Sequence, residues 1–376
     1  MHKILSLLSL WTLFSIDFLG FSLYPSYLPI LLLLFKIKIK YTKSIKIFIV
    51  CFLSLSLIAI VTKLHLIVDV VRAIVMVCYF IYLKNFFTKD KIFDITDISV
   101  GILVAYGCFQ YIAFLTGYGE YGAWLHNQIG YEGLGGPYDA RGGIPRVSSL
   151  TSEPSYFAFT VGIYLFITKK ILVKVLCIIG YFISFSFISI YGALGLIGFY
   201  ILHKLLKIDL FLYMILIFIV QVLFVYTYYA NLAYIETFTA RYTGLSEYLA
   251  SSNIVELLIG IPDTAGQIIT IKRPYSNISS LVVNFGIIGL IAYLYFIAKI
   301  GKKNNMAALA MYLYSFNYYY LTGWPSFVVF LYMIYIDGKS TSISNRTLLQ
   351  FRKDHSAITQ LNQRTNLSSS RNNLHR

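Results

Sequence analysis

The sequence predicts an all-α polytopic membrane protein of about twelve transmembrane helices, and three observations support this class. Hydrophobic residues make up 58% of the 376 residues and charged residues only 12%, a balance that is foreign to soluble domains. Apolar runs long enough to cross about 30 Å of hydrocarbon recur along the chain. All but seven of the 31 Lys and Arg residues fall in the N-terminus, the C-terminal tail or every second loop, which is the positive-inside pattern.

The ends of the expected helices follow from where each apolar run meets a basic or glycine-rich stretch. No small-residue cleavage site follows the first run, so we expect an uncleaved helical hairpin at the N-terminus and not a signal peptide. In order, the expected helices cover residues 4–21, 27–35, 47–62, 66–83, 98–116, 154–168, 172–187, 189–202, 209–229, 280–298, 306–321 and 324–337.

Basic clusters give the orientation of these helices, because short loops rich in Lys and Arg stay in the cytoplasm. We therefore expect a membrane domain over residues 1–338, with both termini cytoplasmic and two long outer loops, 117–153 and 230–279. The tail, residues 339–376, is basic and rich in Ser, Asn and Gln, a composition typical of disorder. The clusters are Lys36 to Lys46, Lys84 to Lys91, Lys169 to Lys174, Lys204 with Lys207, and Lys299 to Lys303.

Several classes of function are disfavoured by what the sequence lacks. The net charge of +15 does not indicate a nucleic-acid partner, because the basic residues follow the loops of a membrane protein and membrane lipids are the expected surroundings. The four cysteines all lie in apolar runs, at spacings that suit neither a metal site nor a disulfide framework. Phosphate-binding glycine loops, dinucleotide fingerprints and zinc-type clusters are absent. We therefore expect no metal and no cofactor.

Five basic residues lie in the two outer loops, where Lys and Arg are usually avoided. The first loop has Arg141 and Arg146, and the second has Arg241, Lys272 and Arg273. Arginine binds phosphate oxygens through a bidentate fork, so these residues are candidates for an anion site. The alternative is that the Asp and Glu residues of the same loops neutralise them.

The stretch from Arg146 to Ala158 leads from a Gly-rich loop into an apolar run. Proline suits the first turn of a helix, and the residue before a proline avoids the α region. We therefore expect Pro154 to be the first helical residue and Glu153 to be its N-cap. The N–H groups at such a helix start attract a carboxylate or a phosphate. The alternative is a capped helix beside solvated arginines, without a bound anion.

Other features of the outer loops have a structural alternative as well. The loop over residues 117–153 has nine glycines and two prolines, so a continuous helix or sheet is not expected there. Its Tyr and Trp residues suit stacking on sugars, but anchoring at the membrane interface is the commoner role. Residues 242–249 predict an amphipathic helix lying on the bilayer surface. His126 is expected to be a surface residue.

Two stretches of the sequence resemble Wzy-type O-antigen and capsular polysaccharide polymerases. The stretch Arg146-Val-Ser-Ser-Leu-Thr-Ser-Glu-Pro-Ser-Tyr-Phe-Ala158 resembles the segment that opens a helix after an outer loop in this family. Asn277 to Leu290, which ends Asn284-Phe-Gly-Ile-Ile-Gly289, is similar to the element that closes the second outer loop. The helical layout with two large outer loops also fits, so the resemblance covers most of residues 1–340. The arginine-ten-residues-glycine pattern of some members is absent.

The resemblance implies a GT-C-like glycosyltransferase of the bacterial inner membrane that needs no metal, cofactor or nucleotide sugar. It would transfer a growing glycan from undecaprenyl pyrophosphate to a hydroxyl of the next lipid-linked repeat unit, with a chain-length regulator and a flippase as partners. Arg146, Arg241 and Arg273 would hold the pyrophosphate. Glu153 would be the base or an orienting cap, although a helix N-terminus favours its ionised form. The other substrate-binding candidates are Arg141, Lys272, Tyr275 and Asn277.

Two alternative functions fit the same layout. O-antigen ligases place a histidine near the start of the closing element, whereas residues 273–277 read Arg-Pro-Tyr-Ser-Asn here, which favours a polymerase. A flippase for lipid-linked sugars would carry out no chemistry. Transporters concentrate charge along helices at mid-membrane depth, whereas this chain concentrates it in the outer loops.

Overall fold

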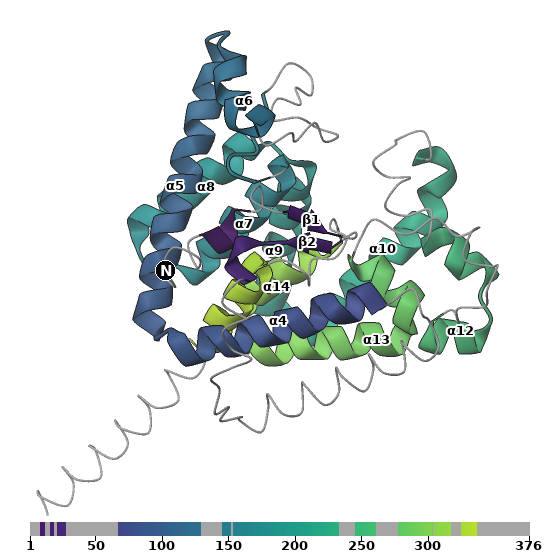
Figure 1. The fold of residues 1–376 in the computed structure, drawn as a ribbon. Coiled ribbons are helices and arrows are strands. Elements are labelled where there is room, and N and C mark those ends of the chain that lie inside the picture. Colours follow the sequence, from purple (N-terminus) through teal and green to yellow (C-terminus); the bar gives the residue numbers. More distant parts are fainter. Residues whose placement is uncertain are drawn as a thin grey trace, which may run out of the picture.

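The computed structural model describes residues 8–11, 16–18, 21–27, 67–128, 145–151, 153–232, 245–260, 277–302, 304–316 and 325–336. Within these residues the chain is helical apart from one short β-hairpin, so the all-α prediction is confirmed (Figure 1). Among them, one helix, Lys89–Leu115, is long and apolar enough to cross a membrane. The expected count of twelve spans is therefore not confirmed.

Most of the expected helices that fall on described residues are present with similar bounds. The helix that begins at Lys89 starts earlier than expected, because the polar residues up to Asp97 continue it. Apart from Tyr27, which ends a short 3-10 helix, the expected helix over 27–35 lies outside the described residues, as do the one over 47–62 and the tail. The elements are η1 (Leu8–Leu10), β1 (Ile16–Phe18), β2 (Phe21–Leu23), η2 (Pro25–Tyr27), α4 (Ile67–Phe86), α5 (Lys89–Leu115), α6 (Gly119–Gln128), α7 (Pro154–Ile167), α8 (Ile171–Ser184), α9 (Phe187–Leu206), α10 (Leu210–Leu232), a helix over 245–251, α12 (Ile254–Ile259), α13 (Asn277–Gly301), α14 (Asn305–Tyr314) and the helix Pro325–Ile336.

The expected first helix, residues 4–21, is wrong. Strands β1 and β2 pair as an antiparallel hairpin in which Asp17 faces Ser22. Each strand has a polar residue between two apolar ones, which is the period-two alternation of a strand and not the pattern of a helix. The high apolar content of this region hid that alternation.

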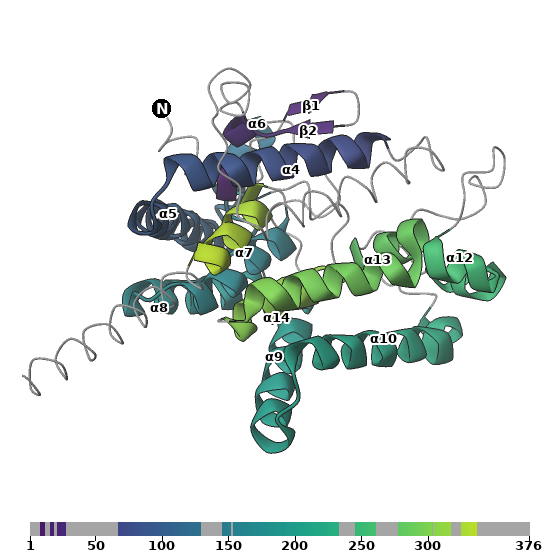
Figure 2. The same cartoon turned by 90° about the horizontal axis from the view of Figure 1, so that it is seen from below.

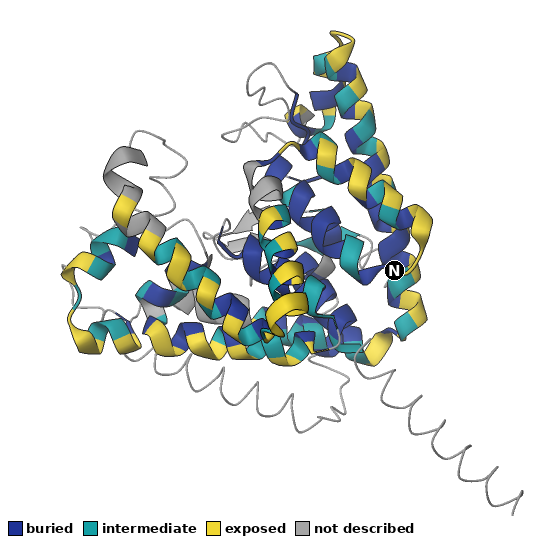
Figure 3. Cartoon of the chain, turned by 180° about the vertical axis from the view of Figure 1, so that it is seen from behind, coloured by how far each residue is buried: buried dark blue, intermediate teal, exposed yellow. Residues whose placement is uncertain are grey.

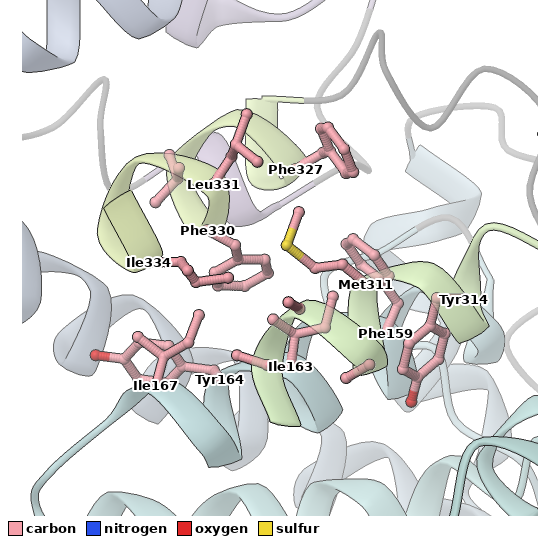
Figure 4. Close-up of a cluster of buried hydrophobic side chains, with 14 of the residues drawn as sticks. Phe159, Ile163, Tyr164, Ile167, Met311, Tyr314, Phe327, Phe330, Leu331 and Ile334 are labelled. Atoms are coloured by element: carbon pink, nitrogen blue, oxygen red, sulfur yellow. The ribbon is translucent and has the colours of Figure 1, made fainter. Parts of the chain in front are cut away.

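Helix α7 lies at the centre of the core. It is apolar on all sides, which is typical of a helix that is buried all round, and it packs against α8, α9 and α14. Figure 4 shows side chains of α7 meeting those of α14 and of the helix Pro325–Ile336. The clustered residues include Phe159, Ile163, Tyr164, Ile167, Met311, Tyr314, Phe327, Phe330, Leu331 and Ile334.

The helices around this core expose apolar side chains. Figure 3 shows buried residues in the middle of the molecule and exposed residues along the outer faces of its helices. Many of the exposed side chains are large and aliphatic or aromatic, for example Phe182 on α8, Leu205 on α9 and Leu223 on α10. In Figure 2, α10 and α13 run side by side, and the two helices are in contact.

Helix α13 is broken at Gly286, so the expected single helix over residues 280–298 is wrong in its middle. Gly286 has φ 64° and ψ −167°, outside the helical region. The parts of α13 before and after Gly286 both contact Ser315, the residue that follows α14. Its carbonyl oxygen accepts from the Ile278 N–H at 3.1 Å, and its hydroxyl lies 2.7 Å from the Tyr293 hydroxyl. A side chain at position 286 would collide with the carbonyl of Leu258 in α12, so the break lets α12 pack against α13.

A second polar contact joins α5 to the end of α7. Asp97 on α5 is 7% exposed and accepts hydrogen bonds from the Tyr164 hydroxyl at 2.5 Å and the Thr168 hydroxyl at 3.1 Å. Lys170 lies 2.9 Å from its other oxygen and 3.0 Å from Asp94. The hydrogen bond with Asp97 is the main cause that raises the pKa of Lys170. The carboxylate of Asp97 thus has three donors that offset its burial.

Replacing Gly286 with Ala tests the break in α13. We expect a loss of about 1–3 kcal/mol from backbone strain alone, with the collision against α12 adding to it. Gly101→Ala on α5 is the matched control, because a side chain there would meet nothing and alanine favours a helix by roughly 0.5–1 kcal/mol. Thermal unfolding in detergent measures both. Equal stability of the two variants would contradict the described break.

Replacing Asp97 with Asn tests the contact between α5 and α7. We expect a loss of about 1–3 kcal/mol, because two hydroxyl groups and an ammonium group lose a charged acceptor. Asp94→Asn removes the other carboxylate that contacts Lys170, but both of those side chains are exposed, so we expect a change within about 0.5 kcal/mol. A loss from Asp94→Asn as large as that from Asp97→Asn, in the same unfolding measurement, would contradict the assignment.

Candidate functional site

The start of α7 is arranged as the sequence predicts. Pro154 is its first residue, and Glu153 is an extended N-cap with φ −145° and ψ 153°. The Glu153 side chain makes no capping hydrogen bond and instead accepts one from the Ser155 hydroxyl at 3.1 Å. This carboxylate therefore does not cap the first turn of α7. Pro154 has no N–H, and the Tyr156 and Phe157 N–H groups donate to the Glu153 carbonyl, so of the first-turn amides only that of Ser155 remains for an anion.

The segment before α7 is polar and almost wholly buried. Arg146 is only 6% exposed, and Ser148, Ser149 and Thr151 are inaccessible to solvent. Burying polar groups costs free energy unless they are hydrogen-bonded, so their partners decide where the segment lies. We use the name polar cluster for these residues together with the two buried side chains that hold them, Gln110 of α5 and His126 of α6.

Helix α5 holds the middle of the segment. The Ser149 N–H donates to the Gln110 side-chain oxygen at 2.7 Å, and the Ser149 hydroxyl donates to the Leu103 carbonyl. Ser149 has φ 55°, a left-handed conformation that is uncommon outside glycine and Asn or Asp, so these two bonds stabilise a tight turn. The Gln110 amide also donates to the Gly122 carbonyl at 3.1 Å. One side chain therefore joins α5, α6 and the segment.

Helix α6 holds the two ends of that turn through His126. Its Nε2 lies 3.1 Å from the Thr151 carbonyl oxygen and 3.0 Å from the Ser148 hydroxyl. The expectation that His126 is a surface residue is wrong, because its side chain is fully buried. Burial lowers the pKa of His126, which favours the neutral ring. A signal was present in the sequence: Gly122, Ala123 and His126 share one helical face, opposite Tyr121 and Trp124.

The two resembling stretches are linked through the end of α14. The Tyr314 hydroxyl donates to the Ala158 carbonyl of α7 at 2.9 Å, and the next residue, Ser315, accepts from Ile278 at the start of α13. The start of α13 and the first turns of α7 are thus held by two consecutive residues, 314 and 315. Stretches more than a hundred residues apart in sequence therefore contribute to one region of the molecule.

The structure describes two of the expected catalytic residues: Arg146, which is buried near the start of the segment before α7, and Glu153, which is half-buried at its end. Asn277 is the first residue of α13, but its side chain lies outside what is described. Within the described residues, the His, Cys, Asp and Glu side chains form no group of three or more that would hold a metal ion. The remaining candidates lie outside the described residues: Arg141, Arg241, Lys272, Arg273 and Tyr275.

The second outer loop differs from its expected form. A helix is present over residues 245–251, but Leu245 and Tyr248 are buried, so this helix does not present its apolar side outward. The Tyr248 hydroxyl donates to the Glu256 carbonyl of α12 at 2.6 Å. Most apolar residues of α12 are exposed instead, and Gly260 ends that helix.

Comparison with known proteins identifies no relative of this chain. Models of known protein families, curated proteins and solved structures were all compared with the chain, and none matches it. The function of the chain has to be inferred from its own residues and their geometry.

Proposed function

We propose that this chain polymerises undecaprenyl-pyrophosphate-linked oligosaccharide repeat units on the outer face of a bacterial inner membrane. The observation that carries the proposal is Arg146, a 6%-exposed arginine on the segment that enters α7. Guanidinium keeps its charge in proteins and matches phosphate oxygens in a bidentate fork. A permanently charged side chain buried in an apolar helical bundle is a candidate for binding an anionic substrate group.

The exposed apolar surface supports placement in a membrane. Five exposed apolar residues of α5 recur at helical spacing along its length: Ile98, Ile102, Phe109, Ile112 and Leu115. Such a stripe over about 25 Å suits contact with lipid tails. Exposed apolar side chains on α8, α9 and α10 extend the same kind of surface around the core. We propose that the chain crosses the membrane repeatedly, up to the twelve times that the sequence predicts.

The two ends of α7 support the orientation. Its start carries Glu153 and, shortly before it, Arg146, whereas its end is followed by the exposed residues Lys169 and Lys170. The positive-inside pattern assigns the lysine end to the cytoplasm and therefore the polar cluster to the outer side. With 14 residues, α7 is about 21 Å long and shorter than the roughly 30 Å of hydrocarbon. The polar cluster would then lie recessed below the outer surface.

Aromatic side chains on and beside α6 fit the same placement. Tyr118, Tyr121 and Trp124 are 60–69% exposed, and α6 packs along the outer part of α5 through hydrogen bonds to Gly122. The part of α5 that α6 contacts still carries the exposed apolar stripe that is proposed to face lipid. Of the two expected roles for these rings, anchoring at the outer membrane interface is therefore favoured over stacking on sugars.

The chemistry follows from the charge that develops on the leaving group. A hydroxyl of the acceptor unit attacks the anomeric carbon of the donor glycan, and the bond from that carbon to the pyrophosphate oxygen breaks. Arg146, with Arg241 and Arg273, would stabilise the departing pyrophosphate, and the Ser155 N–H at the start of α7 would add one donor. Glu153 would accept the proton of the hydroxyl or orient it, although its place at a helix start favours the ionised form and weakens it as a base.

Deleting the gene in its host separates the three activities. A polymerase defect leaves core glycan with a single repeat unit, whereas a ligase defect leaves bare core and accumulated lipid-linked polymer. A flippase defect leaves no repeat unit on the outer face. We expect the first pattern, and either of the others would contradict the proposal.

Replacing Arg146 with Ala tests the site. We expect chain extension by the reconstituted protein to slow by about 10²–10³-fold, the usual effect of removing one donor to a developing negative charge. Lys204→Ala, which removes an exposed cation at the end of α9, is the control and should extend glycan at the wild-type rate. Extension is read from the ladder of lipid-linked products at equal protein amounts. Wild-type extension by the Arg146 variant would remove this residue from the site.

A further inference from the structure

His126 contacts the stretch of chain that joins Arg146 to Glu153, the two described residues that the proposed reaction uses. In the segment before α7, the residues that His126 contacts are Ser148 and Thr151. Arg146 comes two residues before the first of these, and Glu153 comes two residues after the second. We propose that His126 is a positioning residue, which holds the turn between Ser148 and Thr151 and thereby sets where Arg146 and Glu153 lie. This inference rests on the proposed polymerase function.

The hydrogen-bonding partners determine which form of the ring makes these contacts. The Thr151 carbonyl can only accept, so Nε2 of His126 must carry the proton. The lowered pKa of the buried ring agrees with a neutral imidazole that is protonated at Nε2 and bare at Nδ1. Nδ1 is buried and has no hydrogen-bond partner among the described residues. The Nε2 side of the ring therefore makes the contacts to the segment.

Those contacts add to the ones from the neighbouring helices. Gln110 and Leu103 of α5 hold Ser149, and the Ile183 carbonyl of α8 accepts from the Val147 N–H at 3.4 Å. Without His126, the Thr151 carbonyl would lose its partner from α6. The Thr151 hydroxyl donates toward the Ser148 carbonyl at 2.6 Å and the Glu153 carbonyl at 2.8 Å. A displaced Thr151 would therefore move the N-cap residue of α7 as well.

Two substitutions of His126 separate positioning from mere filling of the core. The amide nitrogen of Gln reaches about as far as Nε2, so His126→Gln keeps a donor for the Thr151 carbonyl. Asn is one methylene shorter and reaches only the Nδ1 position, which has no described partner, so His126→Asn loses the donor with a side chain of similar polarity. Asn127→Ala, an exposed neighbour on α6, is the control for substitution in this helix.

The test is steady-state extension of a synthetic polyprenyl-pyrophosphate oligosaccharide by each full-length variant reconstituted in lipid vesicles. We expect His126→Asn to lower kcat by about 10²-fold, as misplacement of catalytic groups by about 1 Å can do, with KM for the lipid-linked donor changed far less. His126→Gln and Asn127→Ala should keep kcat within about threefold of the wild type. A loss of packing alone would lower the amount of folded protein and leave kcat per folded molecule unchanged.

Each other result has one meaning. Wild-type kcat in both His126 variants would overturn the positioning role, and so would equal loss in both variants at normal protein amounts, because the imidazole itself would then be needed. If His126→Asn does not accumulate, His126→Gln decides alone: retained kcat supports the role and lost kcat overturns it. Absence of extension by the wild-type protein would instead contradict the proposed function.

Discussion

The need to satisfy buried polar groups with hydrogen bonds determines the structure around the start of α7. Residues 145–151 are buried next to apolar helices, where an unpaired amide or hydroxyl group is costly. Side chains from α5 and α6 and a carbonyl from α8 supply partners for this segment. The segment is consequently held from three sides.

Helix α7 joins this polar region to a second one. Its middle is apolar on every side and packs in the core, while its far end is bound to Asp97 through Tyr164 and Thr168. Both ends of this short helix are therefore joined to neighbouring helices by buried polar contacts. Such contacts suit a helix whose first turn is proposed to face a pyrophosphate, because preorganised donors stabilise developing charge without rearranging.

Much of the helical scaffold could be predicted from the sequence, because long apolar runs bounded by basic clusters leave few alternatives. The start of α7 was predictable for a local reason: the Glu153-Pro154 pair determines the backbone there whatever surrounds it. The features that could not be predicted depend on tertiary contacts. The break at Gly286 exists because α12 packs against it, and His126 is buried because α6 turns back along α5. The N-terminal hairpin was missed because its alternation spans only three residues in each strand.

The candidate site was predictable only in part. Arg146 and Glu153 lie seven residues apart on one segment, so their shared place in the chain is visible in the sequence. Gln110 and His126 join them only after α5 and α6 are packed, since Gln110 lies 39 residues from its partner Ser149. Neither residue stands out by charge or by motif. Their importance comes from being buried opposite a polar segment, which is a property of the fold.

The orientation of the polar cluster is the most direct test of the function proposed for it. Asn127 on α6 is polar and exposed, so it can be replaced by Cys in a chain whose four native cysteines have been changed to Ser, and intact spheroplasts can be treated with a membrane-impermeant maleimide. We expect labelling of this cysteine from outside the cell. Labelling that requires prior permeabilisation of the membrane would place the polar cluster on the cytoplasmic side and contradict the proposed function.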